Sequence, residues 1–234
     1  IDYTHYFYQP LQFSSTGGIG VMELPQPKPI RHGDEASVGI DLMHTVNGWF
    51  SYNAGLHGSV FHSNQLFWAC DPRITFHFYP AENHEISLHG GCYTQYFHKA
   101  GLTGGGLPTD FFMLADSMLP AERAIATNLR YAASFLNHKW TFQIEGYFKQ
   151  LYGVVESIGN IVQLINLGFD YEKYLITGAG RNYGLNLMLQ RNKGILTGYI
   201  SYSLGWAKRK LPALDGSQEY IYSASHERRH DLNI

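Results

Sequence analysis

Apolar and polar residues alternate with a period of two along most of the chain, the pattern of β-strands that have one apolar face. Trp68 and Phe76, for example, share one predicted face, and Arg73 lies on the other. A slip of one residue would invert each face, so the alternation also constrains the register. The pattern predicts strands near 2–9, 36–46, 49–61, 66–79, 84–98, 123–136, 139–155, 180–191, 194–208 and 225–234.

The connections between these segments alternate in length. Tight joins carry the Asn, Gly and Pro that turns require, and they fall at 47–48, 80–83, 137–138 and 192–194. Longer connections fall at 10–35, 99–122, 156–179 and 209–224, with one short exception at 62–65. Short turns at one end and long loops at the other are typical of a transmembrane β-barrel, with the long loops outside the cell.

Alternation by itself does not distinguish a lipid-facing surface from a protein core. A soluble ligand-binding β-barrel or sandwich would show the same period. Several segments run well beyond the ~5–6 residues of a usual globular strand, which favours membrane-spanning strands. Composition points the same way, because charged and aromatic residues each make up 15% and there are 25 Gly, with a mean hydropathy of -0.21.

Charge and cysteine content exclude several classes. A net charge of -2 gives no basic surface for nucleic acid, so we expect no nucleic-acid partner. No apolar run approaches the ~20 residues of a transmembrane helix. The two cysteines are too few for a disulfide scaffold. The chain begins in strand-like sequence without an initiator Met, so we expect it to be a piece of a longer protein.

Residues 226–230 (HERRH) match the zinc-protease pattern H-E-x-x-H. That chemistry needs a helix, which brings both histidines to one face, and no helical period flanks this segment. In a strand the two rings would be ~13 Å apart at ~3.3 Å per residue, too far for one zinc ion with ~2 Å bonds. We therefore predict barrel-rim or turn residues here, with no metal site and no catalytic residues.

The other histidines are scattered. His57, His77 and His89 all fall on the predicted polar face of neighbouring strands, and we interpret them as part of a hydrogen-bonded lumen network in preference to a metal or haem site. A turn centred near residue 81 would put Arg73 opposite His89. The same register would put Cys70 opposite Cys92 on the apolar face, where two free thiols are favoured over a disulfide.

Six stretches resemble motifs of one family, the TonB-dependent receptors of Bacteroidetes outer membranes. Their order and spacing match along nearly the whole chain. They are residues 71–76 (DPRITF), 101–110 (GLTGGGLPTD), 145–149 (EGYFK), 178–185 (GAGRNYGL), 194–206 (GILTGYISYSLGW) and 227–231 (ERRHD). The last stretch is a barrel strand in that family, which also argues against the zinc-protease interpretation.

The resemblance implies an all-β fold, an antiparallel transmembrane barrel of about 22 strands, with an N-terminal plug. Residues 1–234 would supply about ten of these strands, without the plug and the C-terminal strands. It also implies nutrient uptake across the outer membrane, with no enzymatic activity and no cofactor. The implied partners are the TonB–ExbB–ExbD complex, acting through the missing plug, a surface-exposed lipoprotein and outer-membrane lipid.

Ligand contacts are expected from loops and the outer lumen. The candidates are Gln95, Tyr96, His98 and Asp110 near one loop and Tyr171, Arg181 and Asn182 near another. Two other functions stay open at this point, a soluble or periplasmic ligand-binding β-barrel and an outer-membrane hydrolase that uses lumen His and carboxylates. The ligand also stays open among glycan, peptide, siderophore, haem and cobalamin.

Overall fold

The computed structural model describes residues 1–8, 30–101, 110–157, 175–212 and 219–234. All regular structure in these ranges is β-strand. The strands are β1 (Asp2–Tyr8), β2 (Arg31–Asn47), β3 (Phe50–His62), β4 (Leu66–Ala81), β5 (His84–Gln95), β6 (Phe97–Gly101), β7 (Asp110–Leu114), β8 (Glu122–Phe135), β9 (Trp140–Ser157), β10 (Leu175–Arg191), β11 (Gly198–Leu211), β12 (Tyr220–Ser223) and β13 (His230–Asn233). None of the described residues forms a helix long and apolar enough to cross a membrane.

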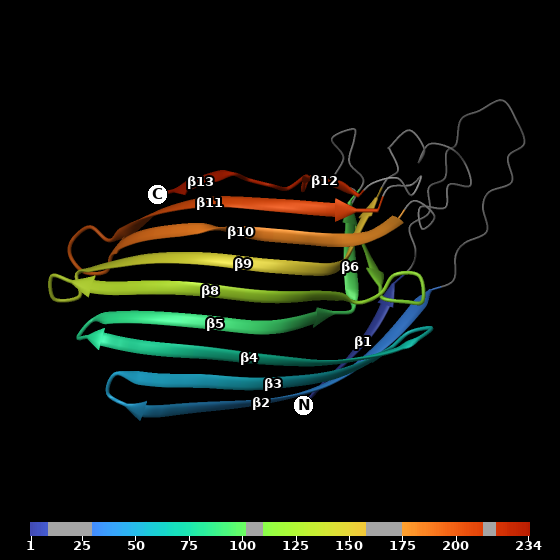
Figure 1. Cartoon of the computed structure of the whole chain (residues 1–234), viewed down its shortest axis with the longest axis horizontal. Coiled ribbons are helices and arrows are strands. Elements are labelled where there is room, and N and C mark those ends of the chain that lie inside the picture. The colour runs from blue at the N-terminus through green and yellow to red at the C-terminus, as the bar shows by residue number, and fades with distance from the viewer. Residues whose placement is uncertain (9–29, 102–109, 158–174, 213–218) are drawn as a thin grey trace, which may run out of the picture.

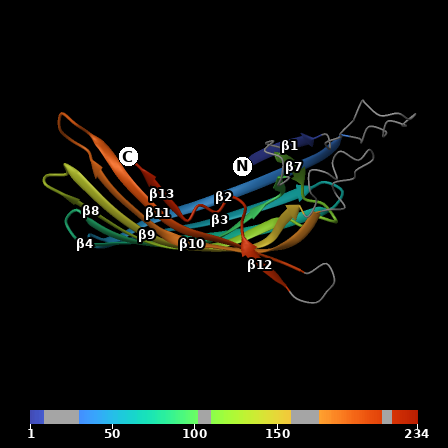
Figure 2. The same ribbon diagram turned by 90° about the horizontal axis from the view of Figure 1, so that it is seen from above.

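Eleven strands form one antiparallel sheet in the order β1-β2-β3-β4-β5-β8-β9-β10-β11-β12, with β13 also paired to β11. Strands that follow each other in the chain are neighbours in the sheet, with two exceptions (Figure 1). Strands β6 and β7 pair with each other in a separate two-stranded sheet, and β13 pairs with β11 and not with β12. Seen from above, the main sheet curves into a trough (Figure 2). The described strands do not close into a barrel, so the trough is a section of wall.

The two ends of the trough differ as the sequence predicts. Short turns join β2 to β3, β4 to β5, β8 to β9 and β10 to β11 at one end, and the long connections lie at the other (Figure 1). Asn83 has φ 65° in the β4–β5 turn, and Asn137 has φ 55° in the β8–β9 turn. Asn adopts this left-handed region more readily than most residues, which explains its place in both turns.

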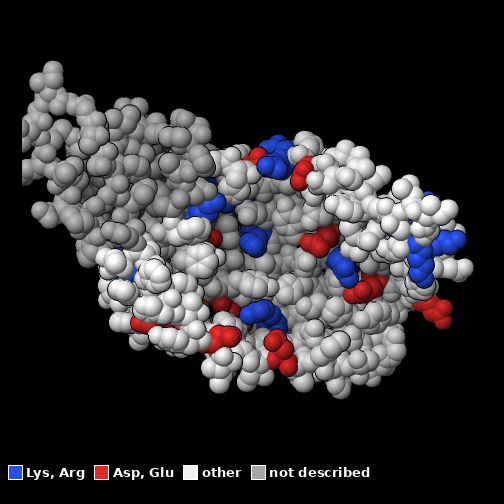
Figure 3. Space-filling view, turned by 180° about the vertical axis from the view of Figure 1, so that it is seen from behind, with Lys and Arg blue, Asp and Glu red and all other residues white. Residues whose placement is uncertain are grey.

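The two faces of the sheet differ in chemistry. On the convex face of β2, Val38, Ile40 and Leu42 are 48%, 71% and 57% exposed. Between Arg181 at the long-connection end and Arg191 at the short-turn end, the convex positions of β2 to β11 carry no Asp, Glu, Lys or Arg. The concave face is hollowed and carries both signs of charge (Figure 3).

Strands β6 and β7 fold into the trough at its long-connection end (Figure 2). They and the segment 115–121 that follows are called the inward hairpin below. The sequence places this region in a loop, and it predicts one strand over 84–98. The strand ends instead at Gln95, because Tyr96 turns its ring onto the concave face, where it stacks on Phe61.

The register between β4 and β5 corrects the sequence prediction. Arg73 lies opposite Gly91, and Thr75 lies opposite His89. The prediction is off by two residues because β4 continues to Ala81, so the turn lies beyond the expected centre, and the pairing is irregular between Phe78 and Ala81.

The two cysteines are also not opposite each other. Cys92 pairs with Ile125 of β8, and both Cys70 and Cys92 are free thiols. The expected free thiols are therefore confirmed, and the expected cross-strand placement is wrong.

Strand ends depart from prediction near the C-terminus. Strand β11 begins at Gly198 and not at 194, because Gly194, at φ 129°, belongs to the turn. Only 230–233 of the predicted strand 225–234 pair as a strand, and β12 lies within the predicted connection 209–224.

Candidate functional site

The concave face carries a ladder of polar side chains across β4, β5 and β8. Glu85 lies at its centre, 2.9 Å from Nδ1 of His77 and 3.1 Å from a terminal guanidinium nitrogen of Arg130. Arg130 also approaches Ser87 and Gln143 at 3.5 Å each. Every second residue of a strand points to the same face of the sheet and lies beside its counterpart on the next strand. The charged groups of the three strands are therefore close enough to pair.

A second set of contacts continues the ladder toward the long connections. His89 bonds through Nδ1 to the Thr75 hydroxyl (2.8 Å) and through Nε2 to the Tyr93 hydroxyl (2.7 Å). The Arg73 guanidinium lies over the Tyr93 ring, 5.5 Å from its centroid. The predicted lumen network is therefore present for His77 and His89. Among the described residues, no cluster of three or more His, Cys, Asp or Glu side chains could hold a metal ion.

The inward hairpin is fastened to the concave face by an aromatic contact. The Tyr96 ring stacks on Phe61 of β3 with centroids 4.9 Å apart and planes 7° from parallel. Its hydroxyl lies 2.8 Å from the Ser59 hydroxyl. Phe61 is fully buried, and Leu114 of β7 joins the same cluster. Gly33 of β2 leaves the space for this packing, because a Cβ there would lie 2.8 Å from the Phe61 ring.

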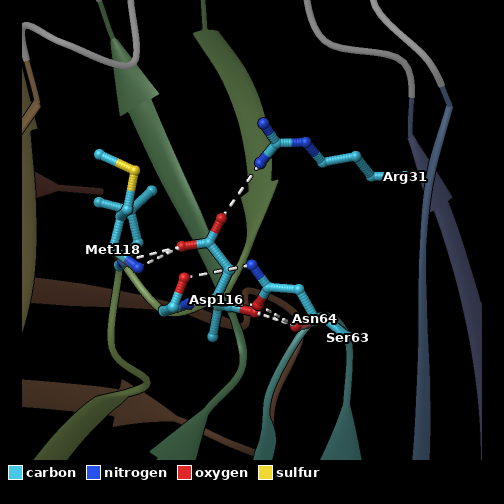
Figure 4. A network of polar contacts seen from close by, with 8 residues as sticks. Arg31, Ser63, Asn64, Asp116 and Met118 are labelled. Atoms are coloured by element: carbon cyan, nitrogen blue, oxygen red, sulfur yellow. Dashed lines mark hydrogen bonds and ion pairs between the residues drawn. The ribbon is translucent and has the colours of Figure 1, made fainter.

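Asp116 makes a second attachment (Figure 4). Its Oδ1 accepts the backbone N–H groups of Met118 (2.8 Å) and Leu119 (2.9 Å), which closes the turn after β7. Its Oδ2 lies 3.1 Å from an Arg31 guanidinium nitrogen of β2. One carboxylate thus shapes the hairpin and ties it to the wall.

The β3–β4 turn supplies the matching contacts. The Ser63 hydroxyl donates to the carbonyl of Ala115 at 2.7 Å. The Asn64 amide donates to the Ser117 hydroxyl at 3.2 Å, and its carbonyl accepts the Ser117 N–H at 3.2 Å. No sequence pattern distinguishes these residues. Asp116-Ser117 after an apolar run is an Asx-turn signal, but nothing in the sequence identifies the partner of Ser117, Asn64, which is 53 residues away.

His98 lies inside the inward hairpin and is 1% exposed. Among the described residues, neither ring nitrogen has a well-aligned hydrogen bond. Burial lowers the pKa of His98, and the backbone of Pro120 and the Asp116 carboxylate oppose that shift. The neutral ring therefore fills the hairpin's interior.

A second concave region lies on β9, β10 and β11. Tyr147, Lys149, Asn182 and His226 line a cleft of about 360 Å³. Asn182 accepts a hydrogen bond from Arg209 at 2.9 Å. Arg209 is 5% exposed, and its guanidinium lies 3.5 Å from Glu156 and 3.4 Å from His226. The cleft therefore combines an aromatic ring, an amide and an amine.

Two glycines make room for this cleft. A Cβ on Gly184 or Gly205 would lie 2.8 Å or 2.9 Å from the Tyr147 hydroxyl. The phenol therefore lies across the bare backbone of β10 and β11, an arrangement that a side chain at either position would obstruct. This packing fixes the direction of the ring at the cleft's floor.

The segment 226–230 is not helical, as expected. His226 lies in the irregular stretch between β12 and β13, and His230 begins β13. Glu227 accepts the Ala207 N–H at 2.8 Å and pairs with Arg229 at 2.8 Å. These contacts attach the segment to β11.

The seven predicted ligand contacts lie in different environments. Tyr96 and His98 are buried in the inward hairpin, so in this arrangement their side chains do not reach the trough. Gln95 is exposed and donates to the Phe97 carbonyl, and Asn182 lines the concave cleft.

The side chains of Arg181 and its neighbour Asn182 point to opposite faces of the sheet. It lies on the convex face, because adjacent residues of a strand point to opposite faces. Tyr171 and the side chain of Asp110 lie outside the described part of the chain.

Comparison with solved structures identifies the fold. The FrpB iron transporter from Neisseria meningitidis (F3-3 variant) matches with a TM-score of 0.58 at 14% identity, over 80% of this chain and 28% of that one. The RagAB peptide transporter matches with a TM-score of 0.52 at 13% identity, over 86% of this chain and 25% of that one. No family model and no curated protein matches the sequence.

The chain thus spans about a quarter of the length of these transporters. At such identities the likeness shows the fold alone. The fold is that of a section of an outer-membrane β-barrel wall, in agreement with the resemblance found in the sequence.

Proposed function

We propose that this chain forms part of the barrel wall of a TonB-dependent receptor that takes up a scarce nutrient across the outer membrane. The observation that carries the proposal is the pair of unlike faces: a convex face free of charge between two charged rims, and a polar, concave face partly covered by an inward hairpin. Lipid outside and a hydrated passage inside require this division.

The width of the uncharged band supports a membrane position. Arg181 and Arg191 lie on the convex face of β10, ten residues apart. That interval is about 33 Å along the strand at ~3.3 Å per residue. A strand tilt of ~40° reduces it to roughly 25 Å, the height of the apolar band on outer-membrane barrels.

The inward hairpin supports a transport role over a purely structural one. It narrows the trough at the end with the long connections, which is the extracellular end of such barrels. A ligand that enters there meets the Asn182 cleft with Tyr147 and Lys149, and the exposed Gln95 near the hairpin's base. We propose these four side chains as ligand contacts.

The transported ligand is proposed only as a class, a solute too large for simple diffusion. The two solved transporters are named for iron and for peptide, and glycan, haem and cobalamin fit the same architecture. The TonB–ExbB–ExbD complex is the proposed energy source, and a surface lipoprotein is the proposed outer partner.

The two rival functions fit less well. A water-soluble barrel would expose the row Val38, Ile40 and Leu42 to solvent, a larger apolar surface than soluble monomers carry. For a hydrolase, the ladder offers His77 paired with Glu85, and Ser51 and Ser87 lie opposite His77 in the two neighbouring strands, but neither hydroxyl forms a hydrogen bond with the His77 ring. Outer-membrane location and the absence of catalysis are therefore part of the proposal.

Uptake by cells that depend on the full-length receptor tests this proposal. Cells would be supplied with ferric siderophore, haem, peptide, glycan or cobalamin as the sole source of a required nutrient, with TonB present or deleted. We expect growth on one of these sources, lost on TonB deletion.

A variant pair links that uptake to the cleft. Lys149→Ala with Asn182→Ala should raise the half-saturating ligand concentration at least tenfold, whereas Leu185→Ala on the convex face of the same strand should leave it unchanged. Uptake that persists without TonB, or recovery of the receptor in the soluble fraction, would overturn the proposal.

A further inference from the structure

Three basic side chains gather on the convex face near the long-connection end of β10 and β11. Arg181 lies directly opposite Lys208 in the antiparallel register, and Lys210 lies opposite Ala179 in the next convex row. They line a cleft of about 470 Å³ that also includes Gln150 of β9 and Glu219 beside β12. This basic cleft is distinct from the concave Asn182 cleft, because it opens on the other face of the sheet.

The pairing of Arg181 with Lys208 is electrostatically unfavourable by itself. Directly opposed residues have Cβ atoms about 4.5–5.5 Å apart, and like charges at that spacing repel. Among the described residues, neither side chain has a carboxylate within ion-pair distance. Glu227 attracts Lys208 only over a longer distance, through the Ser223 hydroxyl that both contact, and the ion pair in this cleft joins Lys210 to Glu219 at 2.5 Å. Two cations thus face each other at a surface that Proposed function assigns to lipid.

The hydrogen bonds leave donors free in this cleft. Arg181 gives its Nε to the Gln150 carbonyl at 2.8 Å, and the Gln150 amide is held by the Gly180 carbonyl at 3.0 Å. The two terminal nitrogens of the Arg181 guanidinium have no hydrogen bond to the described residues. Lys208 donates to the Ser223 hydroxyl at 2.7 Å and has further N–H donors. A fixed guanidinium fork beside an ammonium is the donor set that binds a phosphate.

Apart from Arg209, the rest of the cleft is lined by aromatic and aliphatic side chains and by backbone. Tyr152, Tyr183 and Ile221 line it, and Tyr183 stacks on Trp206 with centroids 5.4 Å apart. An oxyanion site bordered by aromatic and aliphatic surface suits a molecule that carries phosphate at one end and hydrocarbon at the other. Free phosphate would use the donors but not the apolar wall.

The opposite rim has a convex cation that no like charge faces. Arg191 lies over the Trp140 ring, with its guanidinium carbon 5.7 Å from the centroid. Its cross-strand partners are Gly198 and Trp140, so no second cation opposes it. The basic cleft therefore differs from a general rim of lysines and arginines.

We propose that the basic cleft binds the phosphate of a phosphorylated glycolipid in the outer leaflet of the outer membrane. The anion bridges Arg181 and Lys208 and removes their repulsion, and the acyl chains lie along Tyr183 and Ile221. The inference rests on the outer-membrane location in Proposed function, which sets this end of β10 and β11 in the outer leaflet. It concerns lipid on the outside of the wall and is independent of what passes inside.

Lipid binding to the purified full-length protein in detergent tests the cleft. The probes are bisphosphorylated lipid A, the same lipid without its phosphates, phosphatidylglycerol and inorganic phosphate, with bound molecules counted by native mass spectrometry. We expect lipid A to bind and its dephosphorylated form to bind at least tenfold more weakly. Arg181→Gln with Lys208→Gln should abolish that preference, and Arg191→Gln at the other rim should not.

Thermal unfolding gives a second measurement that does not depend on transport. Because the two cations repel, Lys208→Gln should raise the Tm of the lipid-free protein and reduce the rise in Tm that lipid A produces. Equal binding of both lipid A forms, or full binding by the double variant, would refute the site. Tighter binding of phosphatidylglycerol or of inorganic phosphate would also refute a glycolipid site. A negative result in these binding tests would not contradict TonB-dependent uptake. A negative result in the uptake test would not change the measured lipid binding.

Discussion

The wall strands β8 to β11 and the inward hairpin are built by different means. Strands β8 to β11 run 14 to 18 residues each and pair almost without interruption. The inward hairpin has two five-residue strands paired only to each other. Its attachment depends on side chains, chiefly the Tyr96 ring on Phe61 and the Asp116 carboxylate with Arg31.

Because of this difference, we expect the wall strands to be rigid and the inward hairpin to be easier to displace. A wall strand cannot separate from the sheet without breaking a full ladder of backbone hydrogen bonds. Unpaired backbone groups cost on the order of several kcal/mol each in the hydrocarbon of a membrane. The hairpin can leave by breaking one aromatic cluster and a few polar contacts, so it belongs to the part of the molecule that opens at lower free energy. The proposed transport function requires both a fixed wall and an element inside it that can move.

The largest effect should come from removing the aromatic anchor. Phe61→Ala deletes a fully buried ring, a change that typically costs ~3–5 kcal/mol. We expect the inward hairpin to lose amide hydrogen-exchange protection while β8 to β11 keep theirs. Phe76→Ala is the control, because Phe76 lies on the convex face of the neighbouring strand β4 and touches Phe50 instead. Equal loss of protection in the wall would mean that the two regions unfold together.

The next effect tests which face of the wall meets lipid. Leu129 is 55% exposed at the middle of β8, on the convex face, so Leu129→Arg should cost about 2–4 kcal/mol in lipid vesicles. Asn128→Arg, one residue away on the concave face, should change stability by less than about 1 kcal/mol. Urea unfolding in vesicles, followed by tryptophan fluorescence, measures both. A larger cost at residue 128 would reverse the assignment of the faces.

The smallest effect tests the fit of the inward hairpin against the wall. A Cβ on Gly33 would lie 2.8 Å from the Phe61 ring and 2.9 Å from Leu114 Cδ1. Gly33→Ala should therefore loosen the hairpin by about 1–3 kcal/mol through overpacking. Gly39→Ala on the same face of β2 meets its nearest atom at 3.7 Å and should be neutral. Hydrogen exchange in β6 and β7 compares the two variants, and identical profiles would contradict the close fit.

Much of the wall could be predicted from the sequence. Alternation identified the long strands and assigned Trp68 to the convex face and Arg73 to the concave face, because side-chain direction in a strand follows position parity. The register of β4 against β5 was wrong, since a turn that begins two residues later shifts each pair without changing the faces. Such a shift leaves each side chain on the same face of the sheet, but it changes which residue of the neighbouring strand lies opposite.

The sequence did not determine where the side chains of the candidate ligand contacts lie. Gln95 and Asn182 have side chains open to the trough, but Tyr96 and His98 are buried and Arg181 faces outward. Polar and aromatic residues near a loop look alike in sequence whether they bind a ligand or fasten the loop itself. The distinction depends on contacts such as Tyr96 with Phe61, which are 35 residues apart in the chain and leave no local signal.

The sequence by itself determined the strands, the turn end, the loop end and the two chemical faces. These properties are local, because a period of two, a left-handed Asn and a run without charge act over a few residues. The tertiary structure decided that residues 96–101 and 110–121 fold into the trough, that Asp116 ties them to Arg31, and that Arg181 lies opposite Lys208 on the convex face. Those outcomes depend on curvature and on which distant side chains meet, and both are set only when the whole sheet is assembled.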